Sequence, residues 1–291
     1  MLEYCHRLLH KEVYKSGFTE VFAIEKTAAN SNFLRRIMAL TNDNYQSIFK
    51  RKSFHLFRNV GAGIISSEEL AEIKEAYENF ESLYPDIRTA IKIVPAKQVN
   101  FKRDAEYCIL IYSEKKDNYL MNAGYIGEQL DLYLVNKNIG TLWFGIGKPD
   151  EEEFEGLDYV IMIAIHKIED ESKFRKDMFK SKRKPLAETW EGDSLGVGEI
   201  ARFAPSACNT QPWFVRNEGN LLKVYRYKKA GKRGIMPAKA VAFYNRIDIG
   251  IYLCILEICL KEKGISFGRE LFVDDADDQV EYSKVAEYRL Q

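Results

Sequence analysis

The chain has 291 residues, of which 46% are hydrophobic and 30% charged, an ordinary balance for a folded protein with a sizeable core. Lysine plus arginine and aspartate plus glutamate number 43 each, so the chain lacks the basic field that a nucleic-acid partner requires. It also lacks a run of about 18 apolar residues and a signal-peptide core, which predicts a cytoplasmic protein with no membrane span. A small basic cluster for a phosphate stays compatible with this composition.

The cysteines and histidines form no recognisable metal or redox motif. The five cysteines include no C-x-x-C pair, and Cys254 and Cys259 lie in an apolar helical run, which favours reduced core thiols. His6 and His10 have i,i+4 spacing, but no third ligand accompanies them nearby. We therefore predict no metal site.

Helices and strands are predicted from periodicity and from turn residues. Residues 1–40 carry frequent charges without a clear element and are predicted to be a peripheral extension. Ser66 and Glu69 have the spacing of a capping box, which predicts a helix from there to the region of Pro85. The other expected elements, in chain order, are a helix capped by Thr41 or Asn42, strands at 90–94 and 106–112, a helix at 119–138, a strand at 159–166, a charged surface stretch at 169–188, a helix at 195–203, strands at 213–216 and 222–227, a helix at 245–263 and a last strand at 270–273.

The two longest predicted helices share a pattern. With Gly124 aligned to Gly250, both read G-x5-L-[DE]-[LI]-x-L-x4-I, and Asp131 falls opposite Glu257. A glycine inside a helix costs about 1 kcal/mol relative to alanine, so two in equivalent places indicate helix backbones that approach closely. Any two apolar helices agree at several positions, but the matching glycine and acid favour an internal duplication.

The least common string is A-P-S-A-C-N-T-Q-P-W at residues 204–213. Two prolines fix the backbone, and the polar side chains between them can both donate and accept hydrogen bonds, as the edge of a heterocycle requires. A helix-stop loop that satisfies its own backbone fits the pattern equally well. The string closely resembles the A-P-S-x-x-N-x-Q-P-W signature of the nitroreductase (NADH oxidase/flavin reductase) superfamily.

Three further segments resemble elements of the same family. Residues 51–57, R-K-S-F-H-L-F, are similar to its R-R-S-[IV]-R-x-[FY] segment; residues 138–145, N-I-G-T-L-W-F-G, to its G-L-G-[TS]-x-W-I-G; and residues 182–186, K-R-K-P-L, to its K-P-R-K-P-L. Taken alone, the two basic segments are also typical of a solvated helix end or a surface charge run. Trp143 and Phe144 are equally typical of a packed core.

The resemblance implies an FMN site, because a phosphate and the charge of reduced flavin both require cations nearby. A backbone N–H near Gly145 would face flavin N5, and His55, where the family has Arg or Lys, predicts pH-dependent flavin binding. No catalytic side chain is predicted, because hydride transfer depends on orientation. The implied cofactor-binding residues are Arg51, Lys52, Ser53, His55, Trp143, Phe144, Gly145, Arg183, Pro205, Ser206, Asn209 and Gln211.

The order of these segments implies a fused pseudo-dimer. Family members are homodimers whose flavin sites lie at the interface, and each chain carries both the R-R-S and the A-P-S segment. In this chain the first stands in residues 41–190 and the second in residues 191–291. We therefore predict an α+β, nitroreductase-like fold, with the two halves packed around paired central helices, one complete flavin site and a monomeric chain.

The resemblance implies ping-pong hydride transfer from NADH or NADPH, through FMN, to a nitroaromatic, quinone or similar small acceptor. No G-x-G-x-x-G follows a strand, so a separate nicotinamide domain is not indicated. Three alternatives stay open: the same fold with other chemistry, such as reductive dehalogenation or flavin breakdown; a flavin-binding or sequestering protein with little turnover; and a degenerate fold without flavin.

Overall fold

The computed structural model describes residues 44–61, 63–100, 103–228, 233–274 and 281–291. Contacts between residues divide the chain into Met1–Asn42 and Asp43–Gln291, and every described residue belongs to the second unit. The extension predicted for residues 1–40 and the cap at Thr41 or Asn42 lie outside the described residues. From residue 43 onward both predicted halves lie in the second unit, whose first described residues, 44–50, are helical.

The first sheet is antiparallel and is formed by residues of the first half. Its order is β1 (Thr89–Pro95), β2 (Tyr107–Ser113), β5 (Leu157–Lys167) and β3 (Ile139–Phe144), and the short β4 (Glu153–Phe154) also pairs with β5. Strand β2 is apolar throughout because both of its faces are covered. Ile109 and Ile111 face one hydrophobic cluster, whereas Cys108 and Leu110 face another.

The second sheet repeats this strand order in the second half. Its antiparallel strands are β7 (Trp213–Asn217), β8 (Leu221–Tyr227), β10 (Tyr282–Leu290) and β9 (Phe267–Leu271), and β6 (Trp190–Glu191) joins β7 in parallel. In both sheets, the third long strand along the chain lies at the edge and the fourth lies inside it. Both halves also place their long helix between the second and third strands.

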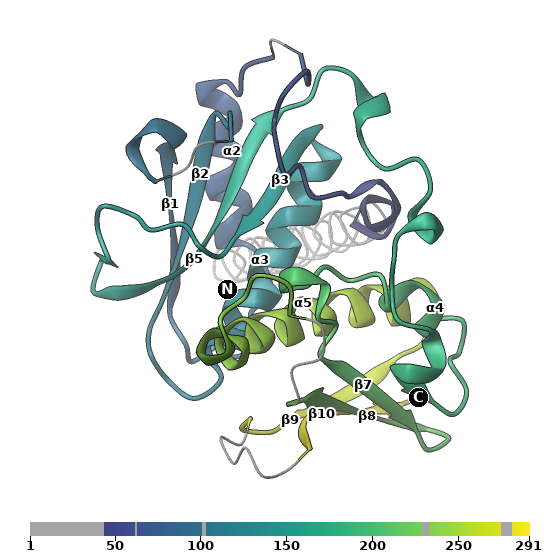
Figure 1. The fold of residues 1–291 in the computed structure, drawn as a ribbon. Coiled ribbons are helices and arrows are strands. Elements are labelled where there is room, and N and C mark those ends of the chain that lie inside the picture. The colour runs from purple at the N-terminus through teal and green to yellow at the C-terminus, as the bar shows by residue number, and fades with distance from the viewer. Residues whose placement is uncertain (1–43, 62, 101–102, 229–232, 275–280) are drawn as a thin grey trace, which may run out of the picture. The chain divides into compact units, whose positions relative to one another are not determined.

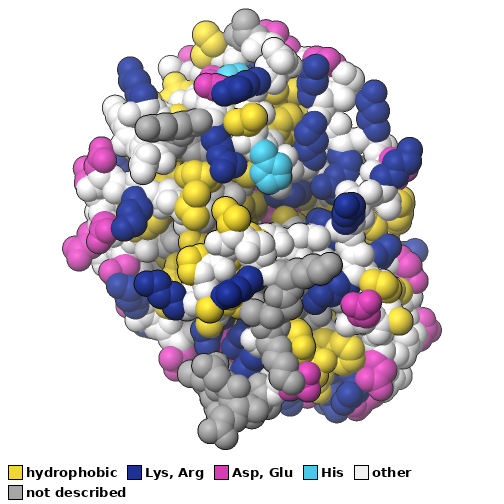
Figure 2. Space-filling view, viewed as in Figure 1, with side chains coloured by type: hydrophobic (Ala, Val, Ile, Leu, Met, Phe, Trp, Pro, Cys, Tyr) yellow, Lys and Arg dark blue, Asp and Glu magenta, His cyan; other side chains and the backbone are white. Residues whose placement is uncertain are grey.

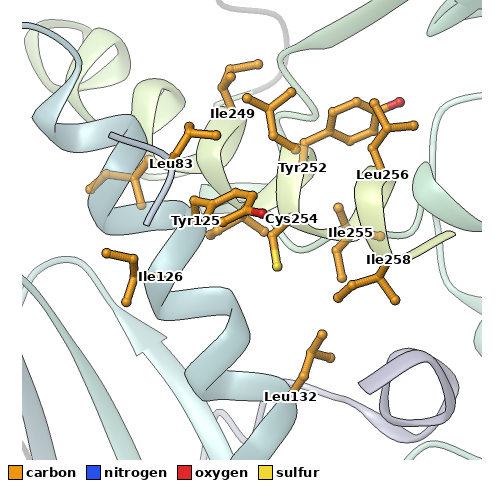
Figure 3. Packing of buried hydrophobic residues seen from close by; sticks show 14 of the residues in the cluster. Leu83, Tyr125, Ile126, Leu132, Ile249, Tyr252, Cys254, Ile255, Leu256 and Ile258 are labelled. Atoms are coloured by element: carbon orange, nitrogen blue, oxygen red, sulfur yellow. The ribbon is translucent and has the colours of Figure 1, made fainter. Parts of the chain in front are cut away.

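The two long helices, α3 (Tyr119–Asn136) and α5 (Val241–Glu262), pack against each other between the sheets (Figure 1). Both are apolar on nearly all sides, as expected of buried helices, and Figure 3 shows Tyr125 of α3 beside Cys254 of α5. A Cβ atom at Gly124 would overlap the carbonyl of Ile247, and one at Gly250 would overlap the carbonyl of Met121. The glycines therefore permit the close helix crossing that the sequence predicts.

The capping box at Ser66 is confirmed at the start of α2 (Ser67–Glu78). The Ser66 hydroxyl accepts a hydrogen bond from the Glu69 N–H at 3.2 Å, and the Glu69 carboxylate accepts one from the Ser66 N–H at 3.0 Å. The helix ends at Glu78, before the predicted region of Pro85. The chain turns there because the next residues bond back to α3, where Asn122 accepts from Ser82 and Tyr84.

Besides the end of α2, the predicted boundaries of three other elements differ clearly from the observed ones. Helix α4 is restricted to Gly198–Ala201, because Leu195 and Gly196 have positive φ and cannot begin a helix, and α5 begins at Val241 rather than at 245. The last predicted strand, at 270–273, is β9 at Phe267–Leu271, and β10 follows it. Charged residues between the apolar positions of β10 obscured its pattern.

Candidate active site

A cavity of about 410 Å³ lies where both halves meet, a size typical of small-molecule sites. Its walls come from residues 51–55, the end of β3, the loop at residues 205–211 and the first turns of α5. On the face drawn in Figure 2, Lys and Arg side chains lie beside a hollow in which hydrophobic side chains are visible. The cavity brings together eight of the predicted residues: Arg51, Ser53, His55, Trp143, Phe144, Gly145, Pro205 and Ser206.

The other four predicted residues do not line this cavity. Lys52 donates a hydrogen bond to the carbonyl of Lys173 and lies over the ring of Phe54. Arg183 donates to the side-chain oxygen of Asn209 at 2.9 Å and to the carbonyl of Phe203 at 3.1 Å. Gln211 accepts from the N–H of Lys184 at 2.8 Å. Arg183, Asn209 and Gln211 therefore join residues 182–184 to the loop that forms the cavity wall.

A buried ion pair holds Arg51 at the cavity. Arg51 is 4% exposed and donates through Nε to the carboxylate of Asp131 at 2.8 Å. The same carboxylate accepts from the Thr141 hydroxyl at 2.6 Å and from the Trp143 indole at 2.8 Å, which fixes β3 against α3. Arg51 Nη2 is buried and has no hydrogen-bond partner among the described residues. Arg51 is thus a fixed cation at the cavity wall, with one buried donor that lacks a partner.

Arg51, Arg175 and Arg183 form an arginine cluster with surplus positive charge. Burial, followed by the neighbouring guanidinium groups, lowers the pKa of Arg175 and of Arg183 to about 10. Asp131 compensates part of this charge. Burial, and then the charge of Asp131, raise the pKa of Glu128 well above its ordinary value, which favours its neutral form. The Nε atom of Arg183 also has no partner among the described residues, so the cluster suits an anion.

The loop at residues 205–211 is strained and firmly held. Cys208, Asn209 and Gln211 have φ values of 49°, 57° and 49°, which L-residues other than glycine seldom adopt. The Ser206 hydroxyl accepts a hydrogen bond from the Gln211 N–H at 3.0 Å and closes the loop. Asp248 of α5 accepts from the N–H of Ala207 at 2.9 Å. This strain fixes Ser206 and the backbone at the cavity wall.

Gly145 lines the cavity, and the absence of a side chain there lets Tyr244 pack against its backbone. The Tyr244 hydroxyl donates to the Gly145 carbonyl at 2.5 Å, and a Cβ atom at Gly145 would lie 2.6 Å from the Tyr244 ring. The glycine is therefore required for the close approach of the Tyr244 ring, which fixes the end of β3 against α5.

Four residues of the site, Asp131, Arg175, Tyr244 and Asp248, were not predicted from the sequence. Asp131 and Asp248 are buried acids in helices that are otherwise apolar on all sides, and such acids require partners, so this pattern could have indicated them. Arg175 lies in a charge-rich stretch, where the sequence gives no signal that separates it from its neighbours.

The part of the chain that the structure describes holds no metal centre. There, no group of three or more His, Cys, Asp or Glu side chains could hold a metal ion. Within the same residues, no helix is long and apolar enough to cross a membrane. The cysteines at positions 108, 208, 254 and 259 are free thiols. The cytoplasmic location stays a prediction.

An α+β fold of two like sheets around a helix pair, with a cavity lined from both halves, is of the nitroreductase-like class. The chain belongs to the family described as "Putative TM nitroreductase", whose model matches residues 43–259. This match confirms the resemblance to the nitroreductase family. No curated protein matches the chain.

Several solved structures are similar to the chain, and the first of those named below shares its fold. That of a "putative nitroreductase" from Thermotoga maritima MSB8 is 18% identical, covers 85% of this chain and 93% of its own, and has a TM-score of 0.53. A nitroreductase family protein from Streptococcus pneumoniae TIGR4 is 12% identical, covers 51% of this chain and 98% of its own, and has a TM-score of 0.39. A "putative nitroreductase in complex with fmn" from Desulfovibrio desulfuricans is 18% identical, covers 50% of this chain and 93% of its own, and has a TM-score of 0.36.

Proposed function

We propose that the cavity binds FMN and that the chain is an NAD(P)H-dependent oxidoreductase acting on a nitroaromatic, quinone or similar small acceptor. The observation that carries this proposal is the spare, buried Nη2 donor of Arg51 in a cluster with surplus positive charge. A dianionic phosphate would satisfy this donor and offset the charge. Family membership and the FMN bound to the relative from Desulfovibrio desulfuricans support the choice of cofactor.

Each wall of the cavity has a role in this proposal. Arg51, with Arg175 and Arg183 nearby, binds the phosphate end, and Ser53 donates beside them. Ile161, Ile247 and Ile251 supply an apolar surface on which a flat ring can lie and from which water is excluded.

The opposite wall orients the reacting atoms. FMN, when bound, supplies reversible hydride transfer. The end of β3 at Gly145, held by Tyr244, and the rigid loop with Ser206 would hold the ring in place, so that the nicotinamide and then the acceptor could use the same face. Lys52, Asn209 and Gln211 act indirectly in this scheme, since their hydrogen bonds hold neighbouring segments.

The proposed site belongs to a single-chain pseudo-dimer. Two observations support a duplication: the equal strand order of the two sheets, and the reciprocal contacts of Gly124 with Ile247 and of Gly250 with Met121. Residues 41–190 and 191–291 would then correspond to two subunits of a dimer. Covalent linkage removes the entropic cost of bringing them together, so one chain suffices for a complete site.

The visible spectrum of the purified protein tests this function. FMN is added to the protein without oxygen, followed by NADH or NADPH, and then by a quinone or a nitroaromatic. We expect flavin bands that shift on binding, bleach with the nicotinamide and return with the acceptor. Binding without bleaching would favour a flavin-sequestering protein, and absence of binding would contradict the proposal.

A further inference from the structure

A second buried acid of the central helices faces the cavity. Asp248 of α5 is 3% exposed and lines the cavity beside the 205–211 loop. Its carboxylate accepts hydrogen bonds from the N–H of Ala207 at 2.9 Å and from the hydroxyl of Thr210 at 3.3 Å. Asp248 has no ion-pair partner among the described residues. Burial raises its pKa to about 8, although both hydrogen bonds oppose this rise.

The first half shows what this position requires for structure alone. By the alignment of Gly124 with Gly250, Asp248 corresponds to Asn122 of α3. The side-chain oxygen of Asn122 accepts from the hydroxyl of Ser82 and from the N–H of Tyr84, both at 3.0 Å. An amide therefore holds the returning loop in the first half, away from the cavity. Holding a loop does not require a group that can carry a proton.

We propose that Asp248 is a positioning residue that couples proton binding to the charge of the flavin in this cavity. Where Asp248 is ionised before reduction, negative charge on a bound flavin would cause its carboxylate to bind a proton from solvent, with formation of an O–H bond. When the flavin is reoxidised, that bond breaks and the proton returns to solvent. The electrons come from the nicotinamide, so Asp248 exchanges a proton alone. This inference rests on the proposed function and extends it.

The physical reason is repulsion between two negative charges in a space with little water. An ionised Asp248 would repel negative charge on the bound flavin ring, whereas a neutral carboxylic acid would not. The other charged or titratable groups that line the cavity are Arg51, His55, Arg103, Cys208 and Tyr244. Burial, followed by the nearby Cys208, raises the pKa of Tyr244, which favours the neutral phenol. His55 and Cys208 are the two other cavity residues that require control variants.

The reduction potential of the FMN-loaded protein, measured between pH 7 and pH 10, tests the proposal. Below about pH 8 the carboxyl is already protonated, so no extra proton is bound on reduction. Above that pH the potential of the wild type should fall more steeply, by about 30 mV per pH unit, since each tenfold change in proton concentration then shifts a two-electron couple by that amount. The Asp248→Asn variant keeps a side-chain oxygen for Ala207 and should lose this extra slope.

Two control variants separate the rival groups. His55→Gln and Cys208→Ser should both retain the steeper region. Equal slopes in the wild type and in Asp248→Asn would overturn the proposal, and so would loss of the steeper region in either control. A wild-type potential without any steeper region overturns it even if Asp248→Asn fails to fold. Failure of the wild type to bind FMN would instead overturn the proposed function.

Discussion

The two central helices carry equivalent acids in different surroundings. Asp131 of α3 accepts hydrogen bonds from Arg51, Thr141 and Trp143. Glu257 of α5 accepts from Arg269 at 2.7 Å, and from the hydroxyls of Tyr125 and Tyr288 at 2.8 Å each. Both acids thus bind one cation and two neutral donors, and both fix a long helix against the strand that follows it.

The surroundings of Arg51, which pairs with Asp131, differ from those of Arg269, which pairs with Glu257. Arg51 has a spare buried donor and two further arginines nearby. Arg269 lies beside Lys261 and Glu81, which pair with each other at 3.5 Å, so positive and negative charges balance there. In both halves, therefore, a buried ion pair on a central helix stabilises the fold. The surplus of positive charge at the Arg51 end is what suits a ligand.

The helix crossing is the feature that the two halves share most closely, and its disruption should have the largest effect. Because a Cβ atom at position 250 or 124 would overlap backbone, Gly250→Ala and Gly124→Ala should each cost about 3 kcal/mol or more in free energy of unfolding. Urea denaturation measures this cost. Gly268→Ala is the control, because nothing lies within 4 Å of its Cβ position. A small cost at either helix position would contradict the reciprocal crossing.

Replacing each acid by its amide distinguishes an effect on stability from an effect on FMN binding. Asp131→Asn and Glu257→Gln both leave a half-buried or buried arginine without its carboxylate, so each should cost about 3 kcal/mol of stability. Asp131→Asn should also alter FMN affinity, whereas Glu257→Gln should not. Chemical denaturation combined with FMN titration at a temperature where both variants are folded compares them. An equal change in FMN affinity would contradict the assignment of the site to the Asp131 end.

The stability of the protein without ligand should reveal Asp248 through its pH dependence. Its pKa is about 8 when folded and about 4 in an unfolded chain, so between these values the folded state keeps a proton that the unfolded state has lost. Wild-type stability should therefore fall, relative to Asp248→Asn, as pH rises from about 4 to about 8, by up to about 1.4 kcal/mol per pH unit. Urea unfolding at several pH values measures both proteins, and parallel curves would contradict the raised pKa.

The smallest expected change in stability comes from removing one uncharged hydrogen-bond donor of Asp131 or of Glu257. Trp143→Phe and Tyr288→Phe each remove one hydrogen bond, to Asp131 and Glu257 respectively, and should each cost about 1 kcal/mol of stability. Trp143 lines the cavity and Tyr288 does not, so Trp143→Phe alone should change the spectrum of bound flavin. A spectral change in Tyr288→Phe would show that the two ends are not independent.

Much of the fold could be predicted from local signals. Apolar runs indicated β2 and β5, a capping box indicated α2, and paired glycines indicated the crossing of α3 and α5. The edges of elements were less accurate because they depend on φ values such as that of Leu195, which the sequence does not reveal.

The site was predictable where it consists of continuous strings and not where it depends on tertiary contacts. Residues 51–55 and 205–208 were identified from their motifs, and the cavity brings them together. The partners of Arg51 could not be identified, because Asp131 lies 80 residues away along the chain and approaches it only through folding. The orientation of Lys52, away from the cavity, was equally hidden.

The most direct test of the account is an FMN titration of the wild type, Arg51→Lys and Arg269→Lys, followed by flavin fluorescence. We expect one FMN per chain, affinity reduced roughly tenfold to 100-fold in Arg51→Lys through loss of a charged hydrogen bond, and unchanged affinity in Arg269→Lys. Two FMN molecules per chain, or equal weakening by both variants, would contradict a single site at the Arg51 end of the helix pair.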